Sequence, residues 1–264
     1  MIISAKDWNA YISTLRKLND KAANQMTAYI IKQGGLINAD NIKGIIDYGY
    51  AIATKYGAGA GTAAADMYDA TAALAGKYLP PAEVAELPTY GDVAQAIYGT
   101  VNRTGNIEEI AASVARLVKL VGQDTTLKNA KRDGAQFAWI PQGETCAFCI
   151  MLASGGWRNI SKAALRNGHA EHIHNNCDCA YAVRFSSDDD VAGYDPDKYY
   201  GMYEKAQEIA ETEGIATRTS EQKANALRRY FYDQNKAEIN AQKRSAYAKR
   251  KERESSAAEE TDIK

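Results

Sequence analysis

The chain has 264 residues, of which 45% are hydrophobic and 25% are charged, so it is long enough to bury a sizeable core. Its net charge of −1 argues against a surface that binds nucleic acid throughout. We recognise no signal peptide and no apolar run of about 18 residues, so we expect no membrane association. In a reducing cytoplasm, clustered cysteines bind metals more often than they form disulfides.

The first 137 residues carry helical patterns. A helix is predicted from Ser4 to Gln33, with Ser4 as its N-cap and Gly34-Gly35 at its end. A second is predicted from Asp40 into the seventies. Its Gly57-Ala-Gly-Ala-Gly61 pattern indicates close helix packing and not a phosphate loop, because no strand precedes it and its third glycine comes too early.

Prolines between residues 80 and 88 predict a break, after which shorter elements follow. Two strand signals flank a segment rich in cysteine and histidine. The predicted helices are Tyr90–Tyr98, Asn106–Val121 and Thr125–Phe137, and the predicted strands are Phe137–Ile140 and Ala180–Phe185.

Charge is distributed unevenly in the C-terminal part. Residues 186–213 contain nine acidic and two basic side chains, a net charge of −7, and residues 214–253 contain eleven basic and four acidic ones, a net charge of +7. Helices are predicted for Pro196–Thr212 and Ser220–Arg253, with disorder after them. The basic helix is either a solvated charged helix or an arm that docks on an acidic protein surface or on packaged DNA.

These patterns predict a mainly α fold. An N-terminal helical domain is followed by a small α+β module rich in Cys and His, and then by a long charged C-terminal helix. The expected domains are a helical docking domain at 1–137, a metal-binding module with an acidic helix at 138–213, and a basic helical tail with a disordered end at 214–264.

All four cysteines and all three histidines lie in the 34 residues from Cys146 to Cys179. Cys146-x2-Cys149 has the spacing of a zinc knuckle, and His174-x2-Cys177 has the same gap. Together they predict a structural Cys₃His zinc site, with Cys179 as an alternative to His174 or Cys177. The competing interpretations are a metal-free packed cluster and a disulfide.

Three enzymatic interpretations fit the same window less well. His169-Ala-Glu171 matches the HxE signature of zinc deaminases, but here the CxxC precedes it. His172-Ile-His174-Asn175 suggests a histidine–metal nuclease, without the strand–helix pattern expected around it. A cysteine hydrolase needs a thiol, a base and an orienting group, whereas this many thiols and imidazoles favour metal ligation. We therefore assign no catalytic residue.

Three stretches between Ala53 and Phe185 resemble one family, the MuF-like minor head proteins of tailed bacteriophages and prophages. Within this family, the branch that the chain resembles most is often labelled capsid maturation protease. The stretches are Ala53–Gly57 with Ala63–Asp69, then Asn129-Ala-Lys-Arg-Asp133 through Trp139-Ile-Pro141 to Thr145–Gly156, and finally His174-Asn-Asn-Cys-Asp-Cys179 with the apolar run after it.

The resemblance implies a head morphogenesis protein located in the virion, inside the capsid or at the portal vertex, and in the host cytoplasm during assembly. Its implied partners are the portal, scaffold or major capsid protein, and no small-molecule substrate is expected. The matching motif residues are Cys146, Cys149, His174, Cys177 and Cys179. The chain departs from the family at Gly156, where an arginine is usual, in lacking a proline after Cys179, and in its two additional histidines. The alternative is a hydrolase acting on head proteins.

Overall fold

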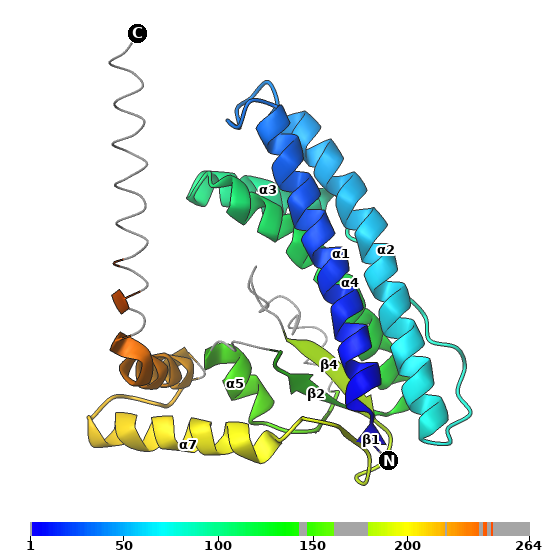
Figure 1. The fold of residues 1–264 in the computed structure, drawn as a ribbon, viewed down its shortest axis with the longest axis vertical. Coiled ribbons are helices and arrows are strands. Elements are labelled where there is room, and N and C mark those ends of the chain that lie inside the picture. The colour runs from blue at the N-terminus through cyan, green and yellow to red at the C-terminus, as the bar shows by residue number, and fades with distance from the viewer. Residues whose placement is uncertain are drawn as a thin grey trace. The chain divides into compact units, whose positions relative to one another are not determined.

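The computed structural model describes residues 2–142, 147–160, 179–219, 221–237, 240–241 and 244. The chain is mainly helical, which confirms the predicted fold class (Figure 1). It divides into two compact units, one of residues 1–145 with 155–196 and the other of residues 146–154 with 197–264. The division expected at 137 and 213 follows different boundaries and stays a prediction. Within the described ranges, no helix is both long and apolar enough to span a membrane.

The first unit begins with a two-residue strand, β1 (Ile2–Ile3), and a long helix, α1 (Ala5–Lys32). Ser4 caps α1 as predicted, because its hydroxyl accepts a hydrogen bond from the backbone N–H of Asp7 at 3.1 Å. After α1 the chain turns through Gly34 and Gly35, which both have positive φ. Glycine adopts this conformation without strain because it has no side chain. These boundaries match the sequence prediction.

The second helix, α2 (Ile42–Leu74), runs unbroken through the glycine-rich stretch. A Cβ atom on Gly57 would lie 3.1 Å from Val121, and one on Gly61 would lie 3.2 Å from the same valine. The glycines therefore let the next long helix approach closely, which confirms the packing interpretation. Alanines at buried positions of α2 serve the same purpose.

The next two helices differ from the prediction in length and number. Helix α3 (Tyr90–Arg103) extends beyond Tyr98, and its first turn is fixed by a capping box between Thr89 and Asp92. Helix α4 (Ile107–Asp133) is a single helix, so the predicted break between Val121 and Thr125 was wrong. Gly122 does not end the helix; it faces α2, where a Cβ atom would lie 3.2 Å from the carbonyl oxygen of Ala60.

Helices α1, α2, α3 and α4 enclose one hydrophobic core. The most extensive helix contact is between α2 and α4. Side chains from all four helices are completely buried in this core, among them Met26, Ile45, Val93, Ile97, Ile110 and Val114. Burial of these apolar side chains is the main contribution to the stability of the packed helices, and the packing fixes where the helix ends lie.

A three-stranded antiparallel sheet in the order β3-β2-β4 follows α4. Its strands are β2 (Gln136–Ile140), β3 (Arg158–Asn159) and β4 (Ala180–Arg184). The two predicted strands are thereby confirmed, and Trp139 lies opposite Tyr181 with ring centroids 4.6 Å apart. A second, two-stranded parallel sheet pairs β1 with β5 (Asp190–Val191) and was not predicted, because β1 lies in the part expected to be all helical and β5 lies in a predicted loop.

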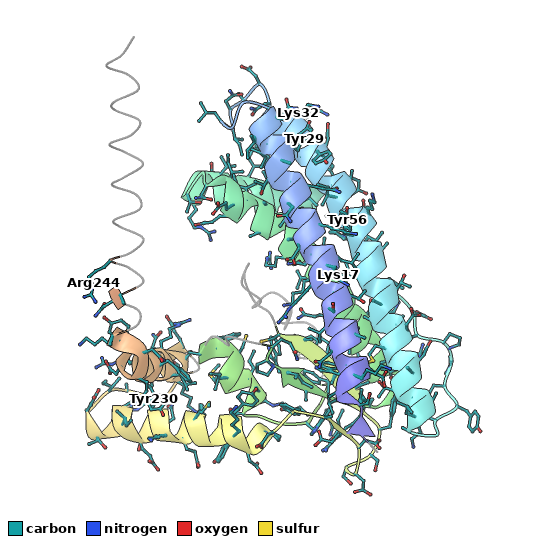
Figure 2. All side chains as sticks on the ribbon, viewed as in Figure 1. Lys17, Tyr29, Lys32, Tyr56, Tyr230 and Arg244 are labelled. Atoms are coloured by element: carbon teal, nitrogen blue, oxygen red, sulfur yellow. The ribbon has the colours of Figure 1, made fainter. Side chains whose placement is uncertain are left out.

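The second unit contains α5 (Ala147–Ala153), α7 (Pro196–Thr212) and a helix over residues 221–237. The predicted bounds of α7 are confirmed. Leu227 is completely buried and packs with Ile150 and Ala206, and Tyr230 lies against the same cluster (Figure 2). The first half of the predicted basic helix thus has an apolar face with a partner, and the rest of that prediction lies almost entirely outside the described residues.

Candidate functional site

The structure places two of the five predicted metal ligands. Cys149 lies on α5 and is 2% exposed, and Cys179 directly precedes β4 and is 0% exposed. The other predicted ligands, Cys146, His174 and Cys177, lie outside the described residues. Searched over its described ranges, the chain has no group of three His, Cys, Asp or Glu side chains that could hold a metal. The zinc site therefore stays a prediction.

The backbone at Cys179 is held by a polar side chain from α4. The Nε2 atom of Gln123, which is 3% exposed, donates a hydrogen bond of 3.1 Å to the carbonyl oxygen of Cys179. This bond fixes where β4 starts relative to α4, because a buried amide is costly unless it is paired. Cys179 belongs to the first compact unit, whereas Cys149 belongs to the second.

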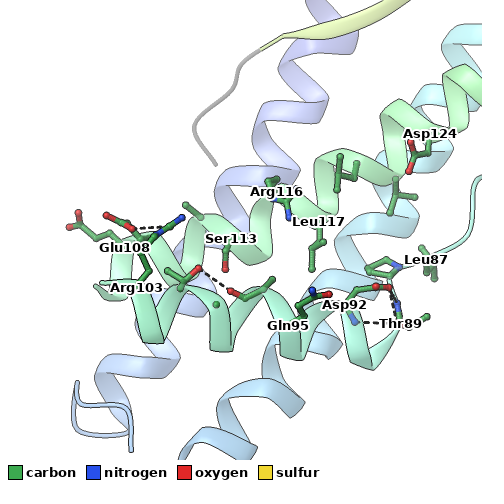
Figure 3. A pocket seen from close by; sticks show the side chains of 18 of the residues that line it. Leu87, Thr89, Asp92, Gln95, Arg103, Glu108, Ser113, Arg116, Leu117 and Asp124 are labelled. Atoms are coloured by element: carbon green, nitrogen blue, oxygen red, sulfur yellow. Dashed lines mark hydrogen bonds and ion pairs between the residues drawn. The ribbon is translucent and has the colours of Figure 1, made fainter. Parts of the chain in front are cut away.

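An open groove of about 1350 Å³ lies between α3 and α4. Helix α3 ends and α4 begins at the connection formed by residues 104–106, and the two helices diverge from it, as Figure 3 shows. Leu117 and Leu120 of α4 form part of the groove's floor, and residues 86–89 line the end that contains Asp124.

The groove is acidic. Its lining contains five carboxylates, at Glu86, Asp92, Glu108, Glu109 and Asp124, against two arginines, at positions 103 and 116, which leaves a net charge of −3. Arg103 already forms an ion pair with Glu109 at 3.2 Å near the narrow end. Ser113, another lining residue, donates its hydroxyl to the carbonyl of Ile110 at 2.7 Å, so it is no activated nucleophile.

Asp124 stands at the wide end of the groove, where the surrounding protein raises the pKa of its carboxyl to about 6. Desolvation is the cause, because it disfavours the charged form. The side chain is nevertheless exposed, so water reduces the energetic effect of this shift.

We expect Asp124→Asn to raise the Tm at pH 7 and to leave it unchanged below pH 4. Because the pKa is higher in the folded chain, the unfolded chain ionises first as the pH rises, so wild-type stability falls between about pH 4 and pH 6. The gain at pH 7 should be at most about 1 kcal/mol after allowance for exposure. Thermal melts at both pH values test this, with Asp66→Asn on α2 as the control for loss of one charge. A pH-independent difference would contradict it.

The loop between α2 and α3 forms one wall of the groove and is held in place by side chains at the end of α4. The Arg132 guanidinium contacts both carboxylate oxygens of Asp133 at 2.8 Å and donates to the carbonyls of Pro80 and Pro81 at 3.0 and 3.1 Å. Tyr68 of α2 donates to Asp133 at 2.8 Å. The Arg132 guanidinium keeps the pKa of Asp133 below its usual value, and burial raises the pKa of Tyr68.

Asn129 holds the same loop at its centre. Its Oδ1 accepts from the backbone N–H of Glu83 at 2.9 Å, and its Nδ2 donates to the carbonyl of Glu83 at 2.8 Å. This side-chain amide thus pairs with both backbone polar groups of Glu83, as a neighbouring strand would do. Thr125 adds a third anchor, since its hydroxyl accepts from the N–H of Ala85 at 2.9 Å. The loop is positioned by a row of polar residues on α4, one helical turn apart.

Residues 2–206 match the model of the family described as VG15 protein. The chain belongs to the VG15 protein family. This is a family of viral and phage genes, which indicates that the chain is a phage protein. Neither the curated proteins nor the solved structures include a match to it. The matched span covers the helical bundle, the cysteine and histidine window and most of α7.

Sequence reasoning did not find the groove. Its lining comes from the loop and two helices, and no short motif joins those residues. A signal was nevertheless present in Asn129-Ala-Lys-Arg-Asp133, which carried the family resemblance. Three of its five residues, Asn129, Arg132 and Asp133, fix the loop that forms the groove wall.

Proposed function

We propose that this VG15 family member is a MuF-like minor capsid protein that acts in head morphogenesis of a tailed phage, near the portal. The observation that carries the proposal is the match of residues 2–206 to a viral and phage family, together with the MuF-like stretches inside that span. The polar row of Asn129, Arg132 and Asp133 gives one of these stretches a structural role, because these side chains hold the loop that lines the acidic groove. Such a surface suits protein–protein assembly.

The test is the composition of the phage particle. Mass spectrometry of purified procapsids and virions should detect the chain in few copies, and chemical cross-linking should join it to the portal, scaffold or major capsid protein. Digestion of intact virions with a protease should leave it uncut if it lies inside the head. Absence of the chain from both particles would overturn the proposal.

We further propose that Cys146, Cys149, His174 and Cys177 coordinate a structural zinc ion, with Cys179 as an alternative to His174 or Cys177. The support is the spacing of the two knuckles and the burial of Cys149 and Cys179, because buried thiolates are stable when they coordinate a metal. A bound ion would stabilise a lobe with little core of its own. The competing function is a metal- or cysteine-dependent hydrolase that acts on head proteins.

Elemental analysis should find about one zinc per chain, and chelation should lower the Tm because structural zinc binding contributes directly to folding. Cys177→Ser should lower the Tm by a similar amount, whereas Ser187→Ala at an exposed position should not. Zinc content near zero would contradict the zinc site. Cleavage of head proteins that Cys177→Ser abolishes without any change in Tm would favour the hydrolase.

A further inference from the structure

The size of the groove between α3 and α4 fits a short helix. An α-helix is about 10–12 Å across and rises 1.5 Å per residue, so a groove of about 1350 Å³ accepts roughly 8 to 11 residues. Its floor is apolar at Leu117 and Leu120, and Leu87 is 40% exposed at its rim. A helix that docks here therefore needs some apolar side chains.

The charge of the groove selects the chemistry of its occupant. With a net charge of −3 the lining repels the phosphates of DNA or RNA, so it is no nucleic-acid site. It attracts a cationic peptide, and Glu108, one of the five lining carboxylates, is exposed at the narrow end.

The chain itself contains such a peptide. Residues 239–253 include six basic and one acidic side chain, a net charge of +5, and the apolar residues Ile239, Ala246 and Tyr247. The sequence predicts them as part of a helix. Because the overall net charge is only −1, two copies repel each other little. The attraction between oppositely charged local surfaces can therefore bring two copies together.

We propose that the groove between α3 and α4 binds part of the basic segment 239–253 of a second copy, roughly 8 to 11 of its residues at a time, so that copies associate head to tail. Each copy then offers one groove and one basic segment, and the contact uses two different surfaces, as heterologous assembly requires. This inference does not depend on the zinc site or on the location of the protein in the virion.

The groove can be blocked at Gly99, which lines it from α3. A Cβ atom there meets no heavy atom within 4 Å, so Gly99→Lys adds bulk and positive charge without a clash in the core. Gly201→Lys on α7 is the matched control, because Gly201 is also exposed and also has open space at its Cβ. A second pair, Glu108→Lys in the groove and Glu208→Lys on α7, tests charge alone.

Sedimentation equilibrium of the full-length chain gives the readout. Wild type and both α7 variants should self-associate at roughly 0.05 M salt and dissociate at roughly 0.5 M, since screening weakens exposed charge pairs. Gly99→Lys should weaken association at least tenfold, and Glu108→Lys should weaken it measurably. Circular dichroism melts confirm that each variant is folded. Equal association of Gly99→Lys and wild type overturns the proposal, as does a monomeric wild type.

A mixing experiment separates this contact from other forms of self-association. One partner is Gly99→Lys, which keeps its basic segment, and the other carries glutamine at the six basic positions of 239–253, which keeps its groove. Each alone should be monomeric, and their mixture should form a one-to-one complex. A mixture that stays monomeric, or a glutamine variant that still self-associates, overturns the proposal.

Discussion

Asn129→Ala should lower the stability of the first compact unit by about 3 kcal/mol, which corresponds to a Tm lower by roughly 6–12 °C. Asn129 is 1% exposed and makes three hydrogen bonds, two to Glu83 and one to the carbonyl of Thr125. Alanine removes all three and leaves the N–H and carbonyl of Glu83 without their partner. The loss of several bonds to partly buried backbone groups is among the few mechanisms that give changes this large.

The neighbouring residue provides the control. Lys128 forms an ion pair with Glu83 at 2.9 Å, but its side chain is 47% exposed and that of Glu83 is 64% exposed. Exposed ion pairs contribute little, so Lys128→Ala should change stability by less than about 1 kcal/mol. Thermal and urea unfolding of both variants compare loss of the amide with loss of the charge. Similar melts for the two would show that Asn129 does not anchor the loop.

Loss of this anchor should also loosen the wall of the groove, because residues 86–89 continue the loop that Asn129 holds. Hydrogen exchange should become faster at the N–H groups of Glu83 and Ala85 in Asn129→Ala, while the core around Ile45 stays protected. Asn129 thus fixes the shape of the groove through its hydrogen bonds to the loop.

The helices were predictable where local chemistry decides their ends. Ser4 and Asn106 each accept a backbone N–H at the third following residue, and this pattern can be read directly from the sequence. Gly34-Gly35 likewise ends α1 because positive φ stops a helix there. The strands β2 and β4 were recognisable as apolar runs with β-branched and aromatic residues.

Other features depend on contacts far apart in the sequence and were not predictable in this way. Gly122 resembles a helix end, but its partner Ala60 lies on another helix. The pairing of β1 with β5 joins residues almost 190 positions apart. The candidate site shows the same division: the cysteine and histidine spacing was visible in the sequence, whereas the groove arises only from the tertiary arrangement of α3, α4 and the loop.

Gly122→Leu should be the most damaging substitution of a small residue in the helical bundle, with a loss of about 3 kcal/mol or more. A Cβ atom at Gly122 would lie 3.2 Å from the carbonyl oxygen and 3.7 Å from the Cβ of Ala60, so the contact is largely with the backbone of α2. Backbone in the middle of a packed helix cannot move aside as a side-chain end can, and overpacking therefore forces the two helices apart.

Gly99→Leu is the matched control for this substitution, because a Cβ atom at Gly99 has nothing within 4 Å. There leucine should be neutral or should stabilise the chain by up to about 1 kcal/mol, since glycine is a poor helix former. Gly122→Ala should fall between the two, because the gain in helix propensity offsets part of the clash. Urea unfolding of the three variants tests this order. Equal stability of Gly122→Leu and Gly99→Leu would mean that α2 and α4 do not meet closely at Ala60.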